Sequence, residues 1–138
     1  MPQLLYRWPM QPPHFQLTAL DCPDPIALAA FYSALTGLEV EPLGDFKPED
    51  VEWIELLNGT SPTLAFQRVP NYVAPTWPEG AVPQQAHLDF TIDDLDRGEA
   101  HVLSIGATKA DYQPGTTFRV YLDPVGHPFC LVQRNPAQ

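Results

Sequence analysis

The stretch that decides the fold is HLDFTIDDLDRGEAHVLSIGA, residues 87–107. It begins with a strand-like run over 87–92 and continues with Asp93 and Asp94, an acidic pair that suits a helix N-cap. The residues after the pair have helical spacing up to Gly106, a residue type that commonly ends helices. The pattern therefore predicts a strand followed by a helix, whose apolar face carries Leu95, Val102, Leu103 and Ile105.

The same pattern occurs earlier, in FQLTALDCPDPIALAAFYSALTG, residues 15–37. Asp24 and Gly37 are 13 residues apart, as are Asp93 and Gly106, and Pro25 suits the first helical position. Strand-like runs follow each predicted helix, over 38–43, 51–57 and 63–69 and again over 107–112, 117–122 and 128–133. This repeat predicts an α+β fold made of two tandem β-α-β-β-β modules.

The 138 residues suit a single domain with one core. Within it we expect a first module at about 15–69, a proline-rich connection at 70–86, and a second module at about 87–134. The connection contains Tyr72 and Trp77. Because prolines stiffen it and aromatic rings need packing partners, we expect an ordered surface loop.

Charge and cysteine content exclude several classes of function. The chain has 17 acidic and 7 basic residues, a formal net charge of -10, which disfavours nucleic acid and anionic membranes as partners. Cys22 and Cys130 are too few and too far apart for a disulfide framework or a zinc finger. No apolar run is long enough to span a membrane, and the first residues do not resemble a signal peptide, so we expect a cytoplasmic protein.

Three phrases together resemble the vicinal oxygen chelate superfamily, and its glyoxalase-like subgroup in particular. They are LDCPDPIALAAFYSALTGLEV (20–40), the stretch 87–107, and RVYLDPVGHPFCLV (119–132). The superfamily includes glyoxalases, bleomycin-resistance proteins and dioxygenases, and the resemblance covers about residues 15–134. It implies that the two modules form a cup-shaped mixed sheet, with any ligand bound inside the cup.

Metal-using members of this superfamily bind the ion through four ligands, two from each module. Transferred to this chain, the first-module positions fall on Leu17 and, within a residue or two, on Gln67, and the second-module positions on His87 and Cys130. Only His87 is a conventional ligand of the family, and leucine cannot coordinate a metal. The resemblance therefore implies a site without metal or other cofactor.

Five residues are the candidates for a ligand-binding cup: Leu17, Gln67, His87, Asp89 and Cys130. His87 and Asp89 share a strand face because they are two residues apart. Alternatives stay open for several of them. His87 can be structural, Gln67 can be a surface amide, Cys130 can be an inert buried thiol, and His87, Asp89 and Cys130 can together form a rearranged metal site.

The leading hypothesis is a glyoxalase-like protein that binds a small organic molecule in its cup without a metal. One alternative is a metal-dependent lyase, isomerase or dioxygenase with a rearranged site, so the sequence leaves open whether the protein is an enzyme. A second alternative is a non-catalytic dimerisation module. Relatives of this size commonly pair, and Tyr72 and Trp77 offer apolar surface, so we expect a homodimer.

Overall fold

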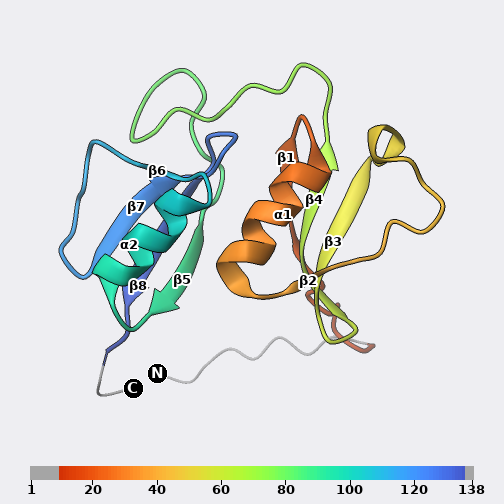
Figure 1. Cartoon of the computed structure of the whole chain (residues 1–138), viewed down its shortest axis with the longest axis horizontal. Helices are drawn as coiled ribbons and strands as arrows, with labels where there is room; N and C mark the ends of the chain where they lie inside the picture. Colours follow the sequence, from red (N-terminus) through yellow and green to blue (C-terminus); the bar gives the residue numbers. More distant parts are fainter. Residues whose placement is uncertain (1–9, 136–138) are drawn as a thin grey trace.

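The computed structural model describes residues 10–135, and it has the α+β fold predicted from the sequence (Figure 1). The first module comprises β1 (Thr18–Cys22), α1 (Pro25–Thr36), β2 (Glu39–Val40), β3 (Trp53–Asn58) and β4 (Ser61–Arg68), with a short 3₁₀ helix η1 (Pro48–Asp50) before β3. The second comprises β5 (Leu88–Ile92), α2 (Leu95–Ser104), β6 (Thr108–Lys109), β7 (Phe118–Leu122) and β8 (Pro128–Gln133). Both modules thus repeat the order β-α-β-β-β.

Each helix begins where the sequence predicts. Asp24 accepts hydrogen bonds from the backbone N–H groups of Ile26 and Ala27 (3.1 and 3.4 Å), and Asp94 caps α2 in the same way. Gly37 ends α1 in the left-handed conformation, at φ 76°. The predicted end of α2 at Gly106 is wrong by one residue, because Ile105 already makes the cap. No helix within 10–135 is long and apolar enough to cross a membrane.

Each module forms its own four-stranded sheet, in the orders β1-β4-β3-β2 and β5-β8-β7-β6. The first strand of each module runs parallel to the last, and the other pairings are antiparallel. The predicted strands at 38–43 and 107–112 shrink to two residues each, β2 and β6. Both are edge strands with one neighbour each, and a short edge strand leaves few unpaired backbone groups exposed.

One hydrophobic core joins the two modules. Helix α1 lies between the sheet of its own module and strand β5 (Figure 1). The Tyr32 ring stacks on Phe66 of its own sheet, with centroids 5.5 Å apart, and approaches Phe90 of the other module at 6.3 Å. Phe31 meets Phe129 edge-on at 5.9 Å. Helix α1 thus packs on its own sheet and contacts the inner face of the second sheet, which α2 also covers. Each sheet has an outer face turned away from this core.

A buried hydrogen bond fixes this arrangement. Tyr32 donates its hydroxyl to Asp123 Oδ2 at 2.7 Å, and Asp123 is only 4% exposed. The other carboxylate oxygen accepts from the backbone N–H groups of Val125 and His127, at 2.9 and 3.0 Å. Burial, followed by the negative charge of Asp123, raises the pKa of Tyr32 far above its usual range, so the hydroxyl stays protonated and can donate. The β7–β8 turn is thereby held against α1.

The connection between the modules is ordered by internal hydrogen bonds. Thr76 pairs with Val82 through backbone and side-chain bonds of 2.6 to 3.1 Å. Tyr72 donates its hydroxyl to the Val125 carbonyl at 2.8 Å, and Trp77 lies 5.9 Å from Tyr112 between ring centroids. The connection thus packs against the second module as a fixed loop.

Removing the Tyr32 hydroxyl tests the importance of this bond. We expect Tyr32→Phe to lower the free energy of unfolding by about 1–3 kcal/mol, because Asp123 loses a buried donor. Tyr112→Phe, at a residue that is 55% exposed, is the matched control and should change stability little. Urea denaturation measures both, and equal stability of the two variants would contradict the assigned role.

Candidate functional site

The outer face of the second sheet carries a small hydrophobic cluster separate from the main core. It contains Val120 and Cys130 with Ala110, and partly buried Trp77, Phe118 and Val132 pack against it. Cys130 lies beside Asp89 on one neighbouring strand and beside Val120 on the other. Because alternate strand residues share a face, the side chains of β5, β7 and β8 converge here.

A cavity of about 440 Å³ lies over this cluster. Apolar side chains supply most of its wall: Trp77, Pro114, Phe118, Val120, Pro128 and Val132. Four residues carry the polar groups: Gln84, His87, Asp89 and Cys130. Trp77 and Gln84 come from the connection, so this segment completes the cavity that the sheet begins.

Three of these polar side chains form a compact cluster. His87 Nε2 lies 3.3 Å from Asp89 Oδ1, and the two side chains are 44% and 58% exposed. Their ligand atoms and the Cys130 sulfur all lie within 4.8 Å of one another. The cluster is open to solvent on the imidazole and carboxylate side and closed on the thiol side, where Cys130 is 7% exposed.

The thiol of Cys130 is not activated. Burial, then the negative charge of Asp89 and its hydrogen bond with the thiol, raises the pKa of Cys130 to about 11. A thiolate nucleophile needs the opposite environment, with a nearby positive charge or helix N-terminus. The interpretation of Cys130 as an inert thiol is therefore the one that this environment favours.

The two first-module candidates lie outside this cavity. Leu17 precedes β1 and is half-buried, and Gln67 is exposed on β4 between Asp21 and Trp53 on the neighbouring strands. Neither lines the cavity. The five candidates expected in one cup are therefore separated within the single chain, because the outer faces of the two sheets do not share a cavity.

The strand registers change which first-module residue corresponds to Cys130. Ala19 pairs with Ala65 in the first module, as Asp89 pairs with Cys130 in the second. Since Leu17 and His87 each lie two residues earlier, the counterpart of Cys130 is Ala65, and Gln67 corresponds to Val132. The shift of two residues lies within the range that the sequence leaves open, because strand pairing in this variable strand has no signature in the sequence.

Sequence reasoning did not single out several cavity residues. Gln84 lies in a stretch without periodicity, and Phe118 reaches the cavity only through the β7–β8 register. The sequence predicts that Trp77 needs a packing partner but does not identify that partner. Pairing register and loop path, which depend on distant residues, decide all three positions.

The chain and its fold are similar to known proteins. The family model of the glyoxalase-like domain matches residues 17–132. No curated protein is detectably similar in sequence. The fold is similar to a glyoxalase/bleomycin resistance protein/dioxygenase family enzyme from Burkholderia phytofirmans PsJN, at 18% identity and a TM-score of 0.60, covering 86% of this chain and 96% of that one.

Two fosfomycin resistance proteins share the fold as well. FosX from Mesorhizobium loti is 17% identical with a TM-score of 0.63, covering 93% of this chain and 96% of that one. FosX from Listeria monocytogenes, as a mutant complexed with Mn(II) and 1S,2S-dihydroxypropylphosphonic acid, is 14% identical with a TM-score of 0.63, covering 90% and 94%. Such low identities establish the fold alone.

The side chains present do not fit a four-ligand metal centre of the superfamily. Leu17 and Ala65 have no donor atoms, and His87, Asp89 and Cys130 form the one cluster of three or more possible ligands found within 10–135. Their ligand atoms lie within 4.8 Å of one another, but they supply three donors at most and come from one module alone. No metal chemistry is therefore assigned to these residues.

Thiol reactivity tests the environment of Cys130. With its pKa near 11, iodoacetamide should modify Cys130 slowly at pH 8, and the rate should rise with pH until about 11. Asp89→Asn should move that profile to lower pH, because it removes a negative charge beside the sulfur. Mass spectrometry of the modified peptides separates Cys130 from Cys22. Rapid modification of Cys130 at pH 7 would show that the thiol is activated after all.

Proposed function

This chain belongs to the glyoxalase-like domain family of the vicinal oxygen chelate superfamily, and we propose that it binds a small organic molecule, without a metal, in the cavity of its second module. The observation that carries the proposal is the cavity itself, in which mostly apolar walls surround a few convergent polar groups. Its volume of about 440 Å³ is within the range of small-molecule sites, which starts near 300 Å³.

The walls and the polar cluster have separate roles in this proposal. Trp77 and Phe118 offer flat apolar surface, which contributes most of the binding free energy of an organic ligand. His87 and Asp89 are partly exposed and can form hydrogen bonds that orient it. Binding without covalent chemistry at the thiol is favoured, because Cys130 stays protonated at neutral pH.

A ligand found by NMR screening of a fragment library would test this proposal. We expect His87→Ala to weaken its binding several-fold, because one neutral hydrogen bond contributes on the order of 1 kcal/mol. Gln67→Ala, which the sequence placed in the same cup, is now the matched control and should leave affinity unchanged. Binding should persist after dialysis against a chelator. Fragments that perturb only the helical face, or binding that the chelator abolishes, would contradict the proposal.

A second proposal is that two chains pair through the outer face of the first module. The connection does not supply the contact, because its Tyr72 and Trp77 turn toward the second module. Phe46 and Trp53 instead line a shallow groove of about 360 Å³ while remaining 71% and 41% exposed. Large apolar side chains exposed next to each other are typical of contact surfaces.

Sedimentation velocity at micromolar concentration tests the pairing. We expect a species of twice the chain mass of 15.4 kDa. The double variant Phe46→Glu with Trp53→Glu should sediment as a monomer, since it places like charges on both sides of the contact. Leu103→Glu, at another exposed apolar residue (42%), is the control and should stay dimeric. A monomeric wild-type chain would rule out the pairing.

A further inference from the structure

We infer that the cavity of the second module selects organic cations, namely protonated amines carried on a flat apolar body, and discriminates against organic anions. The inference rests on the proposed function and specifies the chemical class of its ligand. The geometry points to it through three features: the charges around the cavity, the hydrogen-bond acceptors in its lining, and the aromatic wall.

Apart from His87, the ionisable side chains that line the cavity can carry only negative charge. Asp89 places a carboxylate on the floor, and its side chain is 58% exposed. Among the residues described, no lysine or arginine lines the cavity. His87 is the one lining side chain that can become positive, and it lies 3.3 Å from Asp89, so even when protonated it would only offset that carboxylate. A ligand anion would therefore find no unpaired positive charge here.

The basic residues near the cavity strands pair with acidic residues outside the cavity. Arg119 is adjacent to Val120 in β7, but it points to the opposite face of the sheet and pairs with Asp96 and Glu99 of α2, at 2.8 and 2.9 Å. Lys109 on β6 pairs with Glu99 at 3.0 Å. The sheet therefore separates these cations from the cavity, and they neutralise the helix rather than Asp89.

The lining also carries a second hydrogen-bond acceptor. Gln84 lines the cavity, and its Oε1 atom is covered by protein yet accepts no hydrogen bond from residues 10–135. A buried amide oxygen without a donor is unfavourable by a few times the thermal energy. A ligand reaches the Gln84 oxygen only when that side chain turns toward the cavity, whereas the exposed Asp89 carboxylate is accessible as it stands. Since both oxygens accept hydrogen bonds and neither donates, donor groups on a ligand are complementary to them. An ammonium group donates up to three hydrogen bonds and carries the opposite charge.

The aromatic wall suits the rest of such a ligand. Trp77 and Phe118 line the cavity with Val120 and Val132, and Trp77 is supported by Tyr112 at 5.9 Å. Flat rings stack on flat ligands, and their faces also attract cations. An aryl-alkyl amine therefore matches both the apolar walls and the Asp89 carboxylate of the cavity. The phosphonic acid bound by the Listeria FosX mutant is an anion and has no such match here.

Three indole probes of different charge test the selectivity on the full chain. Tryptamine is a cation, tryptophol is neutral and indole-3-acetate is an anion, while all share one ring system. NMR titration gives their affinities and shows whether the signals of Asp89 and Cys130 shift. We expect tryptamine to bind about five-fold more tightly than tryptophol, and indole-3-acetate to bind most weakly.

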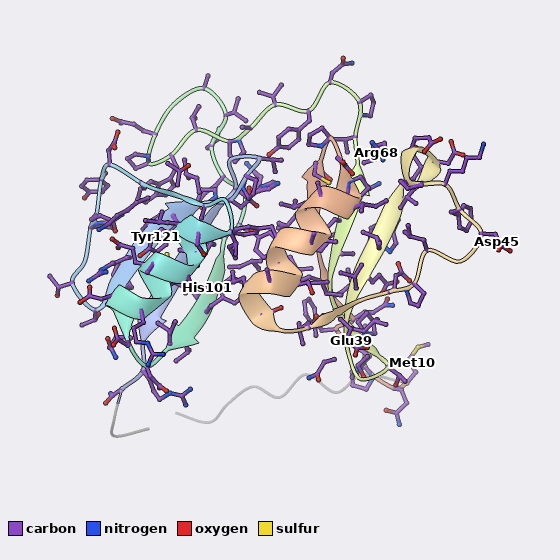
Figure 2. All side chains as sticks on the ribbon, in the orientation of Figure 1. Met10, Glu39, Asp45, Arg68, His101 and Tyr121 are labelled. Carbon is purple, nitrogen blue, oxygen red and sulfur yellow. The ribbon has the colours of Figure 1, made fainter. Side chains whose placement is uncertain are left out.

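Two variants test whether Asp89 causes the preference for the cation. Asp89→Asn should weaken tryptamine binding about five-fold and leave tryptophol binding nearly unchanged. Asp45→Asn removes the same charge at the far edge of the first module (Figure 2) and should alter neither. A preference for tryptamine that Asp45→Asn also abolishes would reflect the general surface charge and would overturn the inference.

The remaining outcomes separate this inference from the proposed function. If tryptophol or indole-3-acetate shifts the cavity signals at equal or lower concentration than tryptamine, the cavity binds organic molecules but the charge selectivity is wrong. If none of the three probes shifts those signals at millimolar concentration, both the selectivity and the small-molecule site in this cavity are rejected.

Discussion

The hydrogen bond between Tyr32 and Asp123 connects a helix of the first module to a turn of the second, and the rest of the structure depends on it. A carboxylate that is 4% exposed needs donors for both oxygens, and this one finds them in the Tyr32 hydroxyl and the backbone of its own turn. The bond therefore requires α1 to lie against the β7–β8 turn. In that position Phe31 and Tyr32 contact aromatic rings of both sheets and join the cores of the two modules.

This arrangement decides which surfaces remain for function. Since α1 and α2 together cover the inner faces of the two sheets, the outer faces are the ones left to bind anything. On the second sheet, the connection folds back and places Trp77 and Gln84 over the outer face, so that a cavity forms. On the first sheet, Gln67 stays exposed beside Trp53. The two modules thus share a topology while presenting different chemistry.

The chemistry of the cavity depends on the residues that stand where metal-using members of the superfamily have their metal ligands. A cysteine on the floor beside Asp89 keeps its proton, because desolvation and a neighbouring negative charge both oppose ionisation. His87 is left with Asp89 as its polar neighbour. Such a floor has little attraction for an anion, whereas donors and positive charges are complementary to it. The apolar walls complete a site suited to an organic molecule.

The sequence by itself determined the modules, the helix starts and the candidates His87, Asp89 and Cys130. These depend on local signals: capping aspartates, helical spacing, and the alternation that puts His87 and Asp89 on one face. The tertiary structure alone decided that Leu17 and Gln67 lie apart from them, that Ala65 is the counterpart of Cys130, and that Gln84 and Phe118 line the cavity. Strand register and the path of the connection set these positions. Both are fixed by packing between residues far apart in the chain, which leaves no local pattern in the sequence.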